Sequence, residues 1–369
     1  MQKKKIIFHH PLPLNFEAPL GSGTRPVKMY KAFVSLGYDV DLAVGYSKER
    51  RESIKTIKSK IDTGEQYQFC YSEASRMPLA LTDEDHLPRR SLMDALFFRY
   101  LKRKRIRSGI FSRDIYWKFE EKVSFSLKKA MKSLFAQIFY RAELCIYKFF
   151  VDKLFLPSLA MGKYIPFIQG DKFHELNSDA TPRKNEVNVP STKLELLYVG
   201  GTVGFYNINL LIDVVSKKFN NTINLTICTR LADAKLLLEQ VGSLTSNVKI
   251  VSHTGAELET LYKKNDCACL YMGSTEYRIF AVPIKLFEYI SFVKPIIASA
   301  DTWVGDFVNE QKLGWTVGYS VTELHCFLEE LVAQRGRIPE LAQYIGKKAS
   351  QYTWQKRCSE VEMILGNIK

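Results

Sequence analysis

The sequence contains no apolar run long enough to cross a lipid bilayer. No stretch of about 18 apolar residues occurs among its 369 residues, and none follows Lys3–Lys5 for long enough to form a signal peptide. Cysteine is scarce, with seven residues and no Cys-x-x-Cys pair. Cys267 and Cys269 occupy alternate positions of an apolar run, which is typical of buried thiols. We therefore expect a reduced, cytoplasmic protein rather than a disulfide-stabilised or membrane-spanning one.

Motifs for common cofactors are missing as well. Gly200–Gly201 follows an apolar run but lacks the G-x-G-x-x-G spacing of nicotinamide-dinucleotide sites, and Gly21–Arg25 lacks the G-x-x-x-x-G-K-[ST] pattern of a phosphate-binding loop. Asp83 and Asp85 lie in a polar loop without a supporting cluster of His or carboxylate residues. No RNA- or DNA-binding signature is present. These observations predict no metal, no cofactor and no nucleic-acid partner.

Acidic residues are too few to balance the basic ones, and the imbalance lies in one half of the chain. The formal net charge is +14 at pH 7. Residues 1–170 hold 31 Lys and Arg against 17 Asp and Glu, whereas residues 171–369 hold 22 of each kind. A basic half beside a neutral half predicts contact with an anionic surface. Membrane lipid, a lipid-diphosphate substrate and nucleic acid are the candidates.

Apolar periodicity predicts an α/β protein built from two similar halves. The first 45 residues have the pattern of strand, Gly-containing loop, helix and strand, which is a β-α-β unit. A polar, proline-containing stretch at 173–192 predicts a linker, after which strands and helices alternate again. With 46% hydrophobic residues, both halves can bury a core. We predict two doubly wound, Rossmann-like domains over residues 1–172 and 193–345.

In open α/β sheets, ligands bind beyond the carboxyl ends of the strands, so polar residues at predicted strand ends are site candidates. In the second half, Arg230 ends a strand, where a guanidinium can hold a diphosphate, although a solvated arginine is the alternative. Lys285 lies in a first helical turn, where the helix dipole favours a phosphate. The other candidate donor-binding residues of this half are Gly201, Thr202, His253, Arg278 and Glu288.

Glu288 lies in a helix rich in Ile, Leu, Phe and Tyr, directly before a buried strand. A carboxylate in such surroundings needs hydrogen-bond donors, and the two hydroxyls of a ribose would supply them. The alternative is an exposed i,i+3 pair with Lys285, which contributes only about 0.2–0.5 kcal/mol. We favour the ligand-binding interpretation.

In the first half, Asp114 is the leading candidate for acid–base catalysis. At a strand end a carboxylate is partly desolvated and can reach an acceptor hydroxyl, and Arg113 beside it would keep it ionised. A helix cap is the alternative role for Asp114. Glu73 occupies a similar strand end and is the second catalytic candidate, with a structural role as its alternative. His9 and His10 end the first strand, and we expect one of them to face the ligand.

Two segments, 92–108 and 123–150, combine Lys and Arg with aromatic and aliphatic side chains. We interpret the first as an interfacial segment on anionic lipid, where each basic residue contributes about 1 kcal/mol. A solvated cationic face over a core helix is its alternative. The second segment is long and connects two strands, so we interpret it as core. The predicted membrane-facing cations are Arg99, Lys102, Arg103, Lys104 and Arg105.

The segment Pro283–Ser299, PIKLFEYISFVKPIIAS, resembles the P-x-K-x-x-E-Y segment of nucleotide-sugar glycosyltransferases with the GT-B fold. The loop GSGTRP at 21–26 and the sequence SRDIYW at 112–117 extend this resemblance, which is to the family 4 type that builds bacterial capsule and lipopolysaccharide glycans. It implies two Rossmann-like domains facing across a cleft, with residues 346–369 as a helix that crosses back to the first domain.

The resemblance also implies roles for single residues. Glu288 would hold the ribose hydroxyls of the donor, while Lys285 and the helix N-terminus would meet the donor diphosphate. Many family members carry a second glutamate eight residues before the one that corresponds to Glu288. This chain has Phe280 at that position, so the identity of the sugar and the stereochemical outcome stay open. The loop residues that would face the donor phosphates across the cleft are Gly23, Thr24 and Arg25.

The resemblance thus implies a metal-independent glycosyltransferase for a hexosyl or related group. It would move the sugar from a nucleotide-sugar donor to a hydroxyl of a glycan or lipid-linked glycan acceptor in bacterial surface polysaccharide synthesis. We expect it in the cytoplasm, peripheral at the inner face of the cell membrane. Two rival functions remain. One is a sugar-nucleotide epimerase on the same fold, which needs neither acceptor nor membrane, and the other is a non-catalytic membrane- or nucleic-acid-binding protein.

Overall fold

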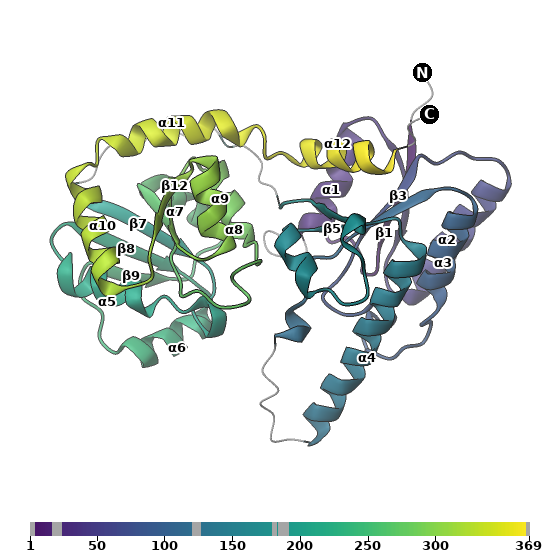
Figure 1. Cartoon of the computed structure of the whole chain (residues 1–369), viewed down its shortest axis with the longest axis horizontal. Coiled ribbons are helices and arrows are strands. Elements are labelled where there is room, and N and C mark those ends of the chain that lie inside the picture. Colours follow the sequence, from purple (N-terminus) through teal and green to yellow (C-terminus); the bar gives the residue numbers. More distant parts are fainter. Residues whose placement is uncertain (1–3, 17–23, 120–126, 179–182, 184–191, 367–369) are drawn as a thin grey trace. The chain divides into compact units, whose positions relative to one another are not determined.

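A computed structural model of the chain describes residues 4–16, 24–119, 127–178, 183 and 192–366. The chain divides into two compact units, one formed by residues 1–177 with 354–369 and the other by residues 178–353. Each unit contains a six-stranded parallel sheet, and Figure 1 shows helices packed around each of them. The prediction of two doubly wound α/β units is confirmed. Among the helices in the described ranges, none is both long and apolar enough to cross a membrane.

The first unit has the strand order β2-β1-β3-β4-β5-β6. Central strand β1 places Ile7 opposite Asp41 of β2 and Cys70 of β3. Ile6, Ile7 and Phe8 are fully buried, as expected for a continuous apolar run in a parallel sheet covered on both faces. The elements are β1 (Lys5–His10), α1 (Thr24–Ser35), β2 (Asp39–Val44), α2 (Ser47–Asp62), β3 (Phe69–Glu73), η1 (Leu79–Leu81), α3 (Met93–Arg103), β4 (Arg107–Phe111), η2 (Tyr116–Lys118), α4 (Leu127–Phe150), β5 (Lys153–Leu156), η3 (Leu159–Tyr164), η4 (Gly170–Lys172), β6 (Phe173–Glu175) and α12 (Trp354–Leu365).

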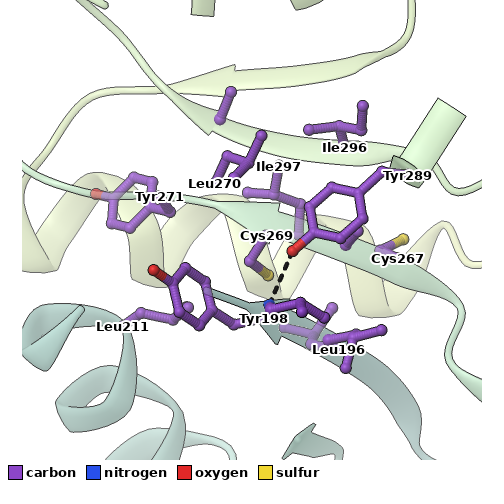
Figure 2. Close-up of a cluster of buried hydrophobic side chains, with 14 of the residues drawn as sticks. Leu196, Tyr198, Leu211, Cys267, Cys269, Leu270, Tyr271, Tyr289, Ile296 and Ile297 are labelled. Atoms are coloured by element: carbon purple, nitrogen blue, oxygen red, sulfur yellow. Dashed lines mark hydrogen bonds between the residues drawn. The ribbon is translucent and has the colours of Figure 1, made fainter. Parts of the chain in front are cut away.

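The second unit has the strand order β12-β11-β10-β7-β8-β9. Leu196 of β7 lies opposite Cys267 of β10 and Leu225 of β8, and Figure 2 shows part of the apolar cluster around β7, β10 and β11. Cys267 and Cys269 are buried in the sheet, as predicted. The elements are β7 (Leu194–Val199), η5 (Gly204–Tyr206), α5 (Asn209–Lys218), β8 (Ile223–Cys228), α6 (Leu231–Val241), β9 (Val248–Val251), α7 (Gly255–Lys264), β10 (Cys267–Leu270), α8 (Ile284–Ser291), β11 (Ile296–Ser299), α9 (Trp303–Gln311), β12 (Gly314–Val317), α10 (Val321–Ala333) and α11 (Arg337–Ala349).

The chain returns to the first unit at α12. Leu365 of this helix lies against Gly109 of β4, where a Cβ atom would come within 2.8 Å of Leu365 Cδ1, so glycine makes room for the helix. The helix begins at Trp354 rather than at 346, because α11 before it belongs to the second unit. At the other boundary, β6 pairs with β5 where the sequence predicts the start of a linker. The sequence did not predict β6, because a strand of three residues is too short to show the alternation of a strand.

Gly314 at the start of β12 provides a test of the packing in the second unit. A Cβ atom there would overlap the backbone of Ile296 in β11. Backbone atoms cannot turn aside as a side chain can, so we expect Gly314→Ala to lower the free energy of unfolding by more than about 3 kcal/mol. Gly336→Ala is the matched control, because no atom lies within 4 Å of a Cβ there. Urea unfolding of both variants measures the difference, and equal stabilities would contradict the packing described.

Candidate functional site

The strand order of the second unit reverses between β7 and β10. Strands β8 and β9 lie on one side of β7, and β10, β11 and β12 lie on the other. At such a point the loops that follow the two neighbouring strands run in opposite directions. Ligands of doubly wound sheets bind in the crevice between these loops. The turn 200–202 directly follows β7, and α8 is the helix that connects β10 to β11. Both predicted donor-binding segments therefore flank the same point of the sheet.

Two buried tyrosines hold the turn and the helix in place. The backbone N–H of Val199 donates a hydrogen bond of 2.9 Å to the hydroxyl of Tyr289 in α8, the bond drawn in Figure 2. The hydroxyl of Tyr198 donates to the carbonyl oxygen of Gly201. Burial raises the pKa of Tyr198 far above its ordinary value, so its hydroxyl stays protonated and remains a donor. The position of α8 beside the end of β7 is thus set by specific bonds as well as by packing.

Glu288 precedes Tyr289 in α8 and is half-buried, with 18% of its side chain exposed. Its Oε2 accepts hydrogen bonds from Tyr262 Oη at 2.8 Å and from Lys285 Nζ at 2.5 Å. Burial raises the pKa of Tyr262 well above its ordinary value, so the phenol keeps its proton. Among the described residues, Glu288 Oε1 accepts no hydrogen bond. A carboxylate oxygen at a sheet edge is therefore left for a donor from outside the chain.

Lys285 completes the i,i+3 pair that the sequence offered as an alternative to ligand binding. It remains 25% exposed, so the pair is accessible to solvent. α8 has eight residues, Pro283 at its N-cap position and no acidic side chain in its first turn. The positive end of the helix dipole is therefore uncompensated within the helix and adds to the charge of Lys285. The pair and a phosphate site are compatible, because the ammonium group can contact both anions.

Arg278 lies in the loop between β10 and α8 and is almost fully buried. Its Nη2 lies 2.9 Å from the sulfur of Met272, and its guanidinium lies 4.8 Å from the centre of the Tyr206 ring. Tyr206 follows the turn after β7, so this cation–π contact joins the two loops at the point of strand reversal. The structure thus places Arg278 at the predicted site, held by contacts that the sequence did not indicate.

The remaining predicted donor residues occupy the same edge of the sheet. The hydroxyl of buried Thr202 donates to the carbonyl oxygen of Asp233 at 3.3 Å. Arg230 is exposed at the N-cap position of α6. His253 follows β9, and its Nδ1 lies 2.9 Å from the Oε2 of Glu257, a carboxylate that can only accept. Thr202 therefore stabilises its loop, whereas Arg230 and His253 keep solvent-accessible groups at the ends of β8 and β9.

The strand order of the first unit reverses between β1 and β3. His9 at this point is fully buried, with Nδ1 at 2.7 Å from Ser72 Oγ and Nε2 at 3.0 Å from Asp94 Oδ1. Arg50 donates two bonds of 2.9 Å to the same carboxylate. Burial alone would raise the pKa of the Asp94 carboxyl, but the charges and hydrogen bonds of Arg50 and His9 together lower it to about 2. His9 is therefore a structural residue, and sequence reasoning missed its partners because Ser72 and Asp94 lie 63 and 85 positions further along the chain.

His10, the last residue of β1, is held in one tautomer. Its Nδ1 lies 2.8 Å from the carbonyl oxygen of Glu73, and because a carbonyl only accepts, Nδ1 carries the proton and Nε2 has the free lone pair. Burial lowers the pKa of His10 to about 4, so the ring is neutral at pH 7. Of the two histidines at the end of β1, His10 is the one with a nitrogen that no described residue contacts.

The Glu73 side chain is buried and paired. Arg25 Nε donates to Glu73 Oε1 at 3.0 Å, and the hydroxyl of Tyr71 donates to the same oxygen at 2.6 Å. The guanidinium of Arg25 lies 3.5 Å from the centre of the Phe111 ring. Burial alone would lower the pKa of Arg25, but the charge of Glu73, together with Tyr71 and the hydrogen bonds to both, raises it above its ordinary value. These contacts favour a structural role for both residues. Thr24 begins α1, and Gly23 lies outside the described residues.

Asp114 follows β4 at the carboxyl edge of the first sheet and is half-buried. Arg113 beside it has a pKa lowered to about 10, first by burial and then by the charge of Arg76, while the charges of Asp114 and Glu73 act in the opposite direction. The charges of Asp114 and Arg113 thus act on each other at this edge of the sheet. Among the described residues, no three His, Cys, Asp or Glu side chains are grouped to hold a metal ion.

The basic segment at α3 has its phenylalanines in the core, whereas Leu92 and Leu96 are exposed. Phe97, Phe98 and Leu101 are fully buried, and the five predicted membrane-facing cations are exposed around them. Two of the cations make contacts within the unit, since Lys104 Nζ lies 2.7 Å from a carboxylate oxygen of Asp62 and Lys102 Nζ donates to a carbonyl oxygen at the end of α4 at 2.8 Å. α3 is therefore a core helix with a solvated cationic face, the alternative weighed for it.

The fold defines a class: an α/β protein of two units, each with a doubly wound parallel sheet, which is the GT-B fold class. Residues 179–352, nearly the whole second unit, match the family model described as glycosyl transferases group 1. No curated protein matches the chain.

Solved structures match over almost the whole length. Anabaena HepE in complex with UDP has 11% identity and a TM-score of 0.64 over 98% of this chain and 99% of its own. Sucrose-phosphate synthase from Thermosynechococcus elongatus has 11% identity and a TM-score of 0.62 over 98% of both chains. WaaG, a glycosyltransferase involved in lipopolysaccharide biosynthesis, has 14% identity and a TM-score of 0.60 over 98% of this chain and 99% of its own. At these identities the likeness establishes the fold.

The buried neutral ring of His10 makes the stability of the first unit depend on pH. Because its pKa is about 4 in the folded chain and 6.5 ordinarily, the unfolded chain binds the extra proton between these values. Stability is therefore complete above about pH 6.5 and falls by about 3 kcal/mol as the pH approaches 4. We expect His10→Gln, which keeps a donor for the Glu73 carbonyl, to lose that part of the pH dependence. The measurement is urea unfolding at several pH values, with hydrogen exchange of the β1 amides as the readout. Identical pH profiles of the wild type and His10→Gln would contradict the role given to His10.

Proposed function

We propose that the protein is a glycosyltransferase that moves a sugar from a nucleotide-sugar donor, bound at α8 of the second unit, to a hydroxyl of a glycan acceptor bound by the first unit. The observation that carries this proposal is the Glu288 carboxylate, held by Tyr262 and Lys285 through one oxygen and open at the other. Ribose hydroxyls are donors that suit such an oxygen. The family match of residues 179–352 and the presence of UDP and UDP-glucose in HepE structures support it.

Departure of the nucleoside diphosphate requires positive charge near the phosphates. Lys285, the N-terminus of α8 and exposed Arg230 supply that charge from the chain itself. Lys285 is already paired with Glu288. A bound diphosphate would contact the same ammonium group, so that the lysine would lie between two anions. We propose that these cations make the transfer independent of a metal ion.

On the acceptor side we propose Asp114 as the group that accepts the proton of the attacking hydroxyl. It is half-buried at the carboxyl edge of the first sheet, where a carboxylate can reach an acceptor hydroxyl, and its charge acts on Arg113 beside it. Glu73 is less suited, because it is almost fully buried and its Oε1 already accepts bonds from Arg25 and Tyr71. His10 offers an uncharged acceptor at the same edge, where its Nε2 could orient a hydroxyl.

The charge distribution supports a lipid-linked glycan as the acceptor. The whole excess of +14 belongs to residues 1–170, and lipid diphosphates and anionic membranes both attract such a surface. We propose a place in the synthesis of a bacterial surface polysaccharide of the capsule or lipopolysaccharide kind, peripheral at the cytoplasmic face of the membrane. The fold shared with WaaG is in keeping with this.

The donor site is tested by calorimetric titration with UDP, GDP, CMP and dTDP. We expect at least one of them to bind with a Kd below about 1 mM. Glu288→Ala should weaken that affinity by about 10–100-fold, because a hydrogen bond to a charged group contributes about 1.5–3 kcal/mol. Glu310→Ala, an exposed helical glutamate of the same unit, is the matched control. The proposal fails if none of the nucleotides binds, and an unchanged affinity of Glu288→Ala would remove the role given to that residue.

Asp114→Asn tests the acceptor side separately. Loss of the carboxylate should lower the rate of transfer by about 100-fold or more, with nucleotide affinity unchanged. Release of the nucleoside diphosphate in the presence of a lipid-linked acceptor, with excess EDTA, measures the rate, and NMR of the product identifies the linkage. Asp171→Asn, an exposed aspartate of the first unit, is the control. Full activity of Asp114→Asn would exclude it as the base, and conversion of the donor sugar without transfer would indicate an epimerase instead.

A further inference from the structure

Helix α4 is much longer than the strands that it connects. It has 24 residues, about 36 Å at 1.5 Å per residue, whereas β4 has five residues, about 17 Å at 3.3 Å per residue. β4 and β5 are parallel neighbours, so the connecting helix must start at the carboxyl edge of the sheet and end at the opposite edge. The N-terminal half of α4 therefore extends beyond the carboxyl edge, as Figure 1 shows.

The two halves of α4 are packed differently. Among the α4 side chains that the structure describes, only Leu144 and Tyr147 are buried, and both lie in the C-terminal half. The prediction that the segment 123–150 is core is therefore wrong for the exposed apolar side chains that the structure describes between Met131 and Ile138. An amphipathic pattern shows that a helix has an apolar face but not whether a neighbour covers that face.

The extended half exposes four large apolar side chains at helical spacing. Their exposed fractions are 64% for Met131, 62% for Leu134, 44% for Phe135 and 57% for Ile138. Positions i, i+3, i+4 and i+7 form one continuous face over two turns of helix. A contiguous apolar face of this kind on a water-soluble surface marks an interaction site rather than an isolated exposed residue. We name it the α4 apolar face.

Aromatic side chains and an arginine border this face on its C-terminal side. Tyr140 follows the apolar turns, and its ring stacks on Trp117 with centroids 5.1 Å apart and planes at 9°. The guanidinium of Arg141 lies over the same Trp117 ring, 5.4 Å from its centre. Trp, Tyr and Arg are side chains that favour the interface between the interior of a bilayer and water.

Charge selects the occupant of the α4 apolar face. Residues 122–142 contain five Lys and Arg and no Asp or Glu. A second copy of the chain would bring two such cationic segments together, which like-charge repulsion opposes. An anionic lipid surface accepts both the apolar side chains and the cations. We propose that the N-terminal half of α4 is the membrane-docking element of this protein and that it binds anionic bilayers.

Docking at α4 also explains how the acceptor is presented. The helix starts at the carboxyl edge of β4, the strand that Asp114 follows, so a lipid headgroup beside α4 lies on the same side of the sheet as the proposed base. This part of the inference rests on the proposed function for the nature of the acceptor. The lipid contact itself requires no donor, no acceptor and no transfer.

The test is sedimentation of the full chain with vesicles of phosphatidylcholine containing about 30% phosphatidylglycerol. We expect the wild type to bind these vesicles and to bind pure phosphatidylcholine vesicles far more weakly. The double variant L134S/I138S should lose about tenfold or more in vesicle affinity, because it removes apolar contacts with the bilayer. The control L236S/L238S changes two exposed leucines of α6 in the second unit and should bind as the wild type does.

Several results would overturn the proposal. They are absence of vesicle binding by the wild type, equal binding to neutral vesicles, an equal loss in the control, and unchanged binding of L134S/I138S. If analytical ultracentrifugation instead shows a wild-type dimer that L134S/I138S dissolves, the α4 apolar face belongs to a second copy. All four leucine and isoleucine positions are exposed, so the variants should keep the thermal stability of the wild type. Nucleotide titration of the same samples separates the proposals, because vesicle binding without nucleotide binding would refute the transferase and leave the docking helix standing.

Discussion

The donor side of this protein depends on the hydrogen bond from the Val199 N–H to the Tyr289 hydroxyl. β10 pairs with β7 only at Leu196 and Leu197, so the last residue of β7 lies beyond that ladder. A buried N–H without an acceptor would cost about 1–3 kcal/mol, and the tyrosine of α8 removes that cost. Because Glu288 is the preceding residue of the same helix, the bond that satisfies the backbone also sets the position of the carboxylate.

Carboxylates at the two sheet edges differ in how deeply they are buried. In the first unit, Asp94 receives two bonds from Arg50 and one contact from His9, and Glu73 receives Arg25 and Tyr71. Such buried pairs stabilise a unique arrangement and leave little for a ligand. Glu288 is less buried and keeps one oxygen open, and the availability of that oxygen supports a binding role.

The features that could be predicted from the sequence are those that depend on residues close together in the chain. The alternation of apolar strands and helices, the turn after β7 and the Lys285/Glu288 pair each need only a few neighbouring residues. The pairing of Arg25 with Glu73 spans 48 positions, and no pattern within either segment indicates the other. For α4, composition indicated an amphipathic helix correctly, but the exposure of its first half depends on the short strands beside it. The opposite error occurred at α3, where the aromatic side chains expected at a lipid surface are buried in the core.

The order of apolar and polar residues along the chain is enough to specify two doubly wound sheets, because backbone hydrogen bonding and burial act over short stretches. It also places the ligand-binding edges, since parallel strands carry their loops at the same end. Which charges neutralise one another, which carboxylate oxygen stays open and which helical face has no covering neighbour were decided only by the tertiary structure. These properties depend on distances between residues far apart in the chain, and such distances exist only once the sheets have formed.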